Sequence, residues 1–184
     1  MSRLRIFTET DGNTPLQTVT EHAGIARELS HVGVRFEKWE ASKSVAPGAS
    51  QDEVIAAYRV DIDRLMHENG YQAVDVVSLN PEHPDRATLR QKFLSEHTHS
   101  EDEVRFFVAG RGLFTLHIGE KIYEVLCERG DLIGVPDGTR HWFDMSEAPY
   151  FIAIRLFTNP AGWVANFTGT DIAARFPRLP AATP

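Results

Sequence analysis

The stretch SEHTHSEDEVRFFVAGRG, residues 95–112, places two of the chain's eight histidines one residue apart, just before an apolar run. Side chains two residues apart on a strand point to the same face, so His97 and His99 would lie together. Glu103 and Arg105 are also an even number of residues from His97 and His99, so on a continuous strand they would share this face. The SED segment before them can, however, bend the chain. The clustering leads to the hypothesis that these side chains meet on a metal ion.

The chain around this stretch predicts a mostly β protein. From about residue 94 onward, short apolar runs are separated by Gly, Asp-Gly or Pro: EVRFFVAG, GLFTLHIG, KIYEVLCE, DLIGVP, HWFDM and YFIAIRLF. Short strands at this spacing are typical of a small antiparallel barrel or sandwich. We therefore expect the metal-bearing barrel core to span about residues 94–158 of a single domain, 1–184.

The first half of the chain predicts strands mixed with a few helices. Runs typical of strands occupy residues 3–8, 34–40 and 71–79. Apolar spacing predicts one helix over 18–33, a second from the N-cap Ser50 to a stop at Gly70, with Glu53 completing a capping box, and a short third helix in 81–93. These helical additions cover about residues 18–70. The proline-rich tail, about 170–184, is expected to be loosely ordered.

Composition excludes several classes of partner. The 184 residues are 42% hydrophobic and 24% charged, with a net charge of -7, which argues against nucleic acid or an anionic membrane. No apolar run is long enough to span a bilayer, and no signal sequence is evident at the start. The single cysteine, Cys127, lies in an apolar run typical of a buried small hydrophobe. We expect a cytoplasmic protein.

A second stretch, GDLIGVPDGTRHWF (130–143), contributes a further histidine, His141. If this segment pairs with residues 94–109, three imidazoles and the Glu103 carboxylate can converge. Three neutral nitrogens and one carboxylate oxygen suit a divalent first-row metal and leave two positions of an octahedral ion open. A closed structural zinc site would more often use thiolates, and the chain has only one cysteine.

The remaining histidines have no partners at ligand spacing. We expect His117 to be a strand residue that faces solvent or a neighbour, and we expect the others to be surface or structural residues: His22, His31, His67 and His83. The four-ligand set is complete without the acidic neighbours of the histidines, so we expect these to support ligands or to be solvated: Glu96, Glu101 and Asp102.

The two segments together resemble the paired motif of the cupin superfamily. Residues 97–110 read His-x-His-x3-Glu-x6-Gly, and residues 130–141 read Gly-x5-Pro-x-Gly-x2-His. Two positions depart from that motif: Gln91 stands where a glycine is usual and Met145 where an asparagine is usual. Neither departure affects a ligand position. Cupins have many functions, so the fold class alone does not select one.

Longer segments of the sequence resemble one particular family within the cupin superfamily. HTHSEDEVRFFVAGRGLFTLHI, CERGDLIGVPDGTRHWFDM and FIAIRLFTNPAGWVANFTG closely resemble the acireductone dioxygenase family of methionine salvage, over about residues 30–169. The resemblance implies cleavage of 1,2-dihydroxy-3-keto-5-(methylthio)pentene by O2. With Fe(II) the family forms 4-methylthio-2-oxobutanoate and formate. With Ni(II) it forms 3-methylthiopropanoate, formate and CO.

The resemblance also implies residue roles. One Fe(II) or Ni(II) per chain would be bound by the positions that match the family's metal ligands: His97, His99, Glu103 and His141. Arg105 matches the arginine that helps to make the bound substrate a dianion. Glu96 matches a position suggested to aid metal incorporation, and Asp102 one suggested to transmit conformational change.

The substrate pocket is less well defined by the sequence. Four aromatic residues suit either a pocket for the methylthio end or plain barrel core: Phe93, Phe107, Phe143 and Trp163. Arg155 suits either stabilisation of the substrate's charge or an ordinary strand surface. We expect a small-molecule substrate and O2 as partners, and a monomer. The alternatives are another metallocupin, such as a different dioxygenase or a sugar isomerase, and a non-catalytic metal-holding sensor.

Overall fold

The 16-residue strand β6 (Glu103–Ile118) organises the fold, because its two halves pair with different strands. This computed structural model describes residues 1–181, except the side chains of residues 162 and 163. The first half of β6 pairs with β8 (Asp131–Val135) and β10 (Phe151–Phe157). Its second half pairs with β7 (Lys121–Glu128) and β9 (Arg140–Asp144). The prediction of two separate strands here was wrong.

Gly110 explains why one strand can serve two sheets. Its φ is 64°, a conformation that side chains disfavour. A Cβ at this position would lie 1.7 Å from the carbonyl oxygen of Tyr150. We expected Gly110 to end a strand, but it lies within β6 and allows that strand to bend.

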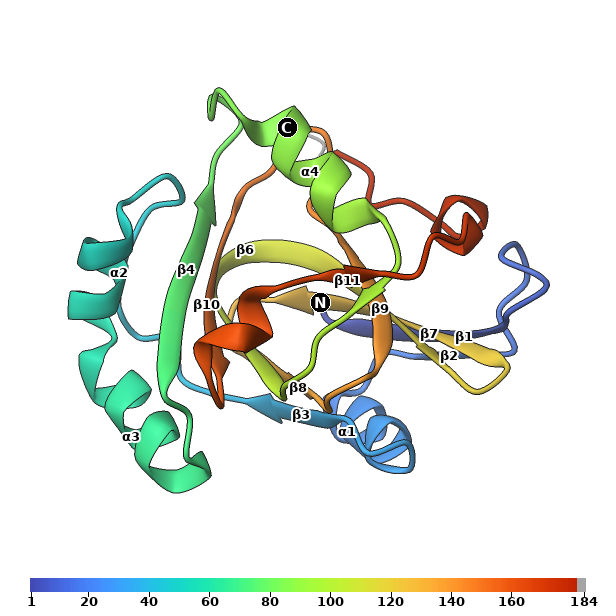
Figure 1. Ribbon diagram of the computed structural model, residues 1–184, viewed down its shortest axis with the longest axis horizontal. Coiled ribbons are helices and arrows are strands. Elements are labelled where there is room, and N and C mark those ends of the chain that lie inside the picture. Colours follow the sequence, from blue (N-terminus) through green and yellow to red (C-terminus); the bar gives the residue numbers. More distant parts are fainter. Residues whose placement is uncertain (182–184) are drawn as a thin grey trace.

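Around β6 the chain forms a cupin-type antiparallel barrel (Figure 1). One series of neighbouring strands runs β11-β5-β9-β6-β7-β1-β2, and the other joins β4 to β10 and β3 to β8. The strands not yet given bounds are β1 (Arg3–Thr8), β2 (Gln17–Val19), β3 (Arg35–Lys38), β4 (Ala73–Leu79), β5 (His97–Thr98) and β11 (Asn166–Phe167). The mostly β fold class predicted from the sequence is confirmed.

The expected helix from Ser50 to Gly70 is two helices, α2 (Gln51–Ala57) and α3 (Arg59–Asn69), which lie along the outer side of β4 (Figure 1). The capping box of Ser50 and Glu53 and the left-handed stop at Gly70 are both present. The break falls at Tyr58, whose ψ of 18° is not helical. Its buried ring packs against Phe106 and its hydroxyl donates to the Lys43 carbonyl, so tertiary contacts replace helical geometry there.

The first helix is shorter than expected. α1 (His22–Ser30) begins after Glu21, whose carboxylate accepts hydrogen bonds from the amides of Ala23 and Gly24. Residues 18 and 19, predicted as the start of the helix, instead belong to the edge strand β2, which pairs with β1. The β-branched Thr18 and Val19 favour this extended conformation. The remaining α-helix, α4 (Arg86–Leu94), matches the short helix expected in 81–93.

Two clusters of buried side chains hold the barrel and its helices. The interior cluster includes Phe107, Phe114 and Phe143, all at most 1% exposed. The second cluster packs Ile62 of α3 and Tyr58, between α2 and α3, against the outer face of β6 and β10. Burial of each such large apolar side chain contributes about 1.5–3 kcal/mol to stability. Among the helices of the described chain, none is long and apolar enough to cross a bilayer.

Several C-terminal residues between 172 and 179 are packed, in contrast to the loosely ordered tail that we expected. The short 3-10 helix η2 (Ile172–Arg175) buries Ile172 against Phe7 and Trp142. Phe176 joins this third cluster, with its ring 5.8 Å from that of Phe7. The amide of Leu179 donates to the buried Asp144 carboxylate at 2.9 Å. The division into one domain with a core at 94–158 stays a prediction.

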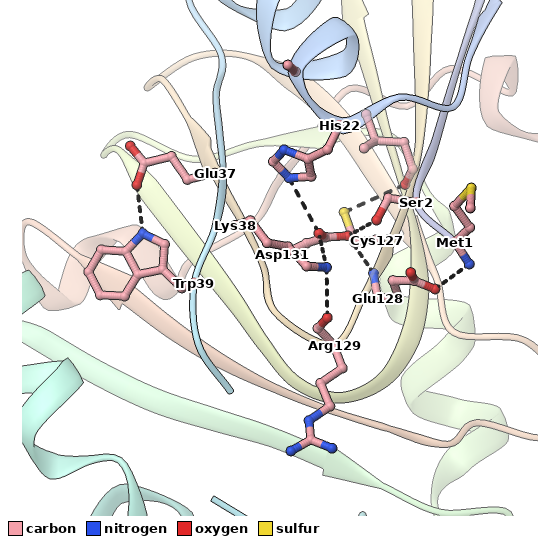
Figure 2. Close-up of polar contacts among 12 residues, drawn as sticks. Met1, Ser2, His22, Glu37, Lys38, Trp39, Cys127, Glu128, Arg129 and Asp131 are labelled. Atoms are coloured by element: carbon pink, nitrogen blue, oxygen red, sulfur yellow. Dashed lines mark hydrogen bonds and ion pairs between the residues drawn. The ribbon is translucent and has the colours of Figure 1, made fainter. Parts of the chain in front are cut away.

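A buried carboxylate joins the start of β8 to the N-terminal strands (Figure 2). Asp131 is fully buried and accepts hydrogen bonds from the Ser2 hydroxyl at 2.6 Å and from Lys38 at 2.9 Å. The Glu128 amide donates to it at 2.8 Å. Cys127, beside this group, is buried as predicted, and burial raises the pKa of its thiol well above the ordinary value.

Candidate metal centre

The pairing of two strands brings His97 and His141 face to face. β5 pairs with β9 at a single register position, where His97 lies opposite His141 with ring centroids 4.4 Å apart. His99, just after β5, lies with its ring centroid 5.1 Å from each of the other two. One ring nitrogen of each of the three lies within 4.8 Å of the others. The expected convergence of imidazoles is therefore present in the fold.

Backbone carbonyls orient all three rings in the same way. The Nδ1 atom of His97 lies 2.8 Å from the Ser95 oxygen, and that of His141 lies 2.8 Å from the Thr139 oxygen. His99 Nδ1 lies 3.0 Å from the oxygen of Val164. A carbonyl only accepts, so each Nδ1 must carry the proton and each neutral ring keeps a lone pair on Nε2. This is the tautomer that a metal ligand needs.

The carboxylate of Glu103, the first residue of β6, completes the cluster. Its Oε2 atom lies 3.3 Å from His99 Nε2 and 3.8 Å from His141 Nε2. Within the described part of the chain these three buried atoms have no hydrogen-bond partner. Buried polar atoms without a partner are costly. Because these three atoms lie close together and lack partners, a single divalent cation bound between them would satisfy all three.

Burial and neighbouring charges keep His97, His141 and Glu103 in the protonation states that bind a metal ion. Burial lowers the pKa of His97 to about 4 and that of His141 to about 3. Burial alone would raise the pKa of Glu103, but Arg105 and the histidines outweigh it and hold the pKa well below its ordinary value. At neutral pH His97 and His141 are therefore neutral imidazoles and Glu103 is an ionised carboxylate.

Arg105 is buried beside the cluster. Its Nε donates to Glu103 Oε1 at 2.5 Å, which leaves the Oε2 atom free to face the histidines. Its guanidinium carbon lies 4.8 Å from the Phe114 ring centroid and 4.9 Å from that of Phe143. The aromatic faces and the carboxylate together stabilise a cation that is only 2% exposed.

A small cavity of about 60 Å³ opens onto the cluster. Its lining residues are Lys92, Phe93, His97, His99, Arg105, Arg155 and Ala165. Of the predicted pocket residues, Phe93 and Arg155 thus line it, whereas Phe107 and Phe143 pack in the barrel interior. The side chain of Trp163 lies outside the described residues. Arg155 is not a free surface arginine, because it is ion-paired with Asp75.

Lys92 was not among the residues predicted from the sequence. It lies in the last turn of α4, is exposed, and reaches the cavity beside Phe93. A lone lysine on an amphipathic helix carries no motif, so only the docking of α4 against β9 reveals its position.

Two acidic residues near the ligands lie in different surroundings. Asp102 is exposed and accepts a hydrogen bond from the Asp137 amide at 2.8 Å, which links the loops before β6 and β9. Glu96 is 1% exposed and hydrogen-bonds to His117. His117 therefore faces neighbours rather than solvent, with its two ring nitrogens close to Glu96 and Glu9. It takes no place in the cluster.

The antiparallel barrel, with its buried imidazoles beside a carboxylate, defines a cupin-type protein with a candidate metal centre. The chain belongs to the ARD/ARD' family, whose model matches residues 3–165.

Known relatives are similar over nearly the whole chain. An acireductone dioxygenase of Stenotrophomonas maltophilia (strain K279a) is 62% identical over 97% of this chain and 96% of its own length. One of Pseudomonas aeruginosa (strain UCBPP-PA14) is 64% identical over 97% and 99%. A solved acireductone dioxygenase from Bacillus anthracis, with a cadmium ion in its active centre, has a TM-score of 0.79 and 31% identity, covering 91% of this chain and 98% of that one.

Proposed function

We propose that this chain is an acireductone dioxygenase, which cleaves 1,2-dihydroxy-3-keto-5-(methylthio)pentene with O2 in methionine salvage. One observation carries the proposal: the unpartnered atoms of His99, Glu103 and His141 face one another beside a buried arginine, at the end of a cavity. The similarity to relatives that bear this name supports it over nearly the full chain.

His97, His99, Glu103 and His141 would hold one divalent cation per chain, Fe(II) or Ni(II). The solved relative, with cadmium in its active centre, supports a divalent ion. Three nitrogens and one carboxylate oxygen suit first-row metals of this kind. When bound, the ion supplies a Lewis acid and a template with open positions for the substrate's oxygens.

The chain's own residues would bind the substrate and stabilise its ionised form. Arg105 places a fixed positive charge at the cavity, where the negative charge of an ene-diolate collects. Arg155 lines the same cavity with its charge partly balanced by Asp75. Phe93 offers an apolar contact for the methylthio end. A dianion held in this way has enough electron density to react with O2.

We further propose that the products depend on which ion is present. Fe(II) would give 4-methylthio-2-oxobutanoate and formate, whereas Ni(II) would give 3-methylthiopropanoate, formate and CO. An ene-diol ketone has several oxygens, so its binding to the ion can differ with the ion's geometric preference. The same cavity would then direct O2 to different carbons.

The test is to strip the protein, reload it with either ion, add substrate and O2, and measure headspace CO and the oxo acid. CO from the nickel form and oxo acid from the iron form are expected. Identical products from two active forms would indicate another cupin dioxygenase. Binding of substrate without O2 uptake would indicate a sensor. Roles for Glu96 in metal incorporation and for Asp102 in conformational change stay predictions, as do the monomeric state and the cytoplasmic location.

A further inference from the structure

Residues 164–170, which we term the strap, lie over two of the candidate ligands. The Val164 carbonyl accepts a hydrogen bond from His99 Nδ1 at 3.0 Å, and Ala165 lines the cavity. Strand β11 of the strap pairs with β5, so that Phe167 lies opposite His97 with ring centroids 5.7 Å apart. The strap therefore touches both histidines from a part of the chain about 65 residues beyond His99.

The C-terminal end of the strap is anchored on Glu96. The Thr168 amide donates to the Glu96 backbone oxygen at 3.1 Å. The hydroxyls of Thr168 and Thr170 both donate to the carboxylate atom Oε2 of Glu96, at 2.7 and 3.0 Å. Glu96, which directly precedes His97, thus accepts hydrogen bonds from the strap at both its backbone oxygen and its carboxylate.

His117 holds that carboxylate from the other side. Its Nδ1 atom lies 2.6 Å from Glu96 Oε1, and its Nε2 atom lies 2.9 Å from Glu9 Oε2. Glu96 and His117 are 1% and 4% exposed. One imidazole ring thus contacts two carboxylates, and its contact with Glu96 is buried. The Glu96 carboxylate is therefore contacted at Oε1 by His117 and at Oε2 by the two threonines.

We propose that Glu96, His117, Thr168 and Thr170 form a latch that fixes the strap on β5 and thereby orients His99 and His97 toward the metal ion. The proposal rests on the proposed function, because it assumes that these histidines bind a metal. The four are positioning residues, since none of them lines the cavity. Loosening the latch frees the Val164 carbonyl, and with it the ring of His99.

The two threonines allow a clean test because both are exposed. Thr168→Val with Thr170→Val keeps the shape and removes both hydroxyl donors, whereas Thr168→Ser with Thr170→Ser keeps the hydroxyls. Each protein is loaded with Ni(II), and release into excess chelator is timed. Loss of a group that orients a ligand costs about 10–100-fold in affinity, so we expect release at least about 10-fold faster from the valine variant and nearly unchanged release from the serine variant.

A matched control is Thr18→Val with Thr20→Val, a pair of exposed threonines with the same spacing on and beside β2. Release from this control at the wild-type rate is expected. As a second measurement, amide hydrogen exchange at Thr168 should quicken in the valine variant and stay slow in the serine variant.

Equal release rates in the valine, serine and wild-type proteins would overturn the latch. Failure of the wild-type protein to retain Ni(II) at all is a different result, which contradicts the proposed metal centre itself. His117→Gln, measured in the same way, extends the test to the buried member: fast release supports the latch, and wild-type release contradicts it.

Discussion

A histidine binds a metal ion only when its ring is neutral and its lone pair faces the ion. His97 and His141 meet both conditions before any ion arrives, because backbone carbonyls hold their Nδ1 protons and burial lowers their pKa values. The same burial makes the metal-free protein sensitive to acid. An unfolded histidine has a pKa of about 6.5, so the unfolded chain takes up protons first as the pH falls.

The free energy of unfolding of the metal-free protein should therefore decrease as the pH falls below about 6.5. His97, with a folded pKa of about 4, and His141, with one of about 3, each contribute. The slope approaches about 1.4 kcal/mol per pH unit for each group. Urea unfolding between pH 7.5 and 5 measures it, because carboxylates are largely ionised in both states over that range. A slope equal to that of a metal-free His141→Gln variant would contradict this prediction.

Arg105 should matter to turnover more than to metal binding. It donates to Glu103 Oε1, whereas the Oε2 atom faces the histidines, so Arg105→Ala should retain one ion per chain near pH 7.5. Loss of a group that stabilises negative charge lowers kcat by about 10²–10³-fold. Substrate-dependent O2 uptake and bound metal are measured together. Arg111→Ala, on the same strand, is the control. A wild-type kcat in the Arg105→Ala variant would contradict the role assigned to Arg105.

At the scale of elements, α4 contributes the cavity's one exposed cation among the described residues, Lys92. The chain as a whole has a net charge of -7 and would repel an anionic substrate, so a local cation should speed encounter. Lys92→Gln is expected to lower kcat/KM by about 3–10-fold at low salt, with little effect at high ionic strength where charges are screened. Lys121→Gln, on β7, serves as the control. A loss of kcat/KM of the same size at low and high ionic strength would argue against this electrostatic role.

The packed C-terminal segment should contribute measurably to stability. Phe176 is 4% exposed and packs against Phe7 and Trp142, so Phe176→Ala leaves a cavity. Such truncations cost about 3–5 kcal/mol. Denaturant unfolding of the variant measures the loss, and Leu16→Ala, at an exposed position, is the control. A change below about 1 kcal/mol would mean that the segment is held only loosely.

The elements that the sequence predicted best are those with a local signal. The capping box of Ser50 and Glu53 and the stop at Gly70 depend on neighbouring residues, and both are present. The errors arose where distant contacts override the local pattern. Tyr58 leaves helical geometry to meet Phe106 and the Lys43 carbonyl, and Gly110 bends a strand that it was expected to end.

The C-terminal segment shows the same limit. Its prolines suggest a loose chain, but Phe176 finds an apolar site formed by Phe7 and Trp142, which are far away in the sequence. No pattern within the segment itself could reveal this partner.

At the scale of the whole molecule, the site joins segments that the sequence keeps far apart. The spacing of His97, His99, Glu103 and His141 was enough to predict their convergence, because β5 and β9 pair with His97 opposite His141. The spacing could not predict which contacts position these four side chains. The position of the strap at 164–170 depends on the pairing of β11 with β5, and His117 is buried against Glu96 and Glu9. Neither feature has a sequence motif of its own.

The most direct test of the central claim is to count metal ions and O2 molecules in the same preparation. Wild-type protein and the His141→Ala variant are stripped, loaded with Fe(II) without oxygen, freed of excess ion, and assayed for bound metal and for O2 uptake on addition of the acireductone. We predict one ion per chain and one O2 consumed per substrate for the wild type, with both lost in the variant. A His141→Ala protein that retains one ion per chain and consumes O2 at the wild-type rate would contradict the account.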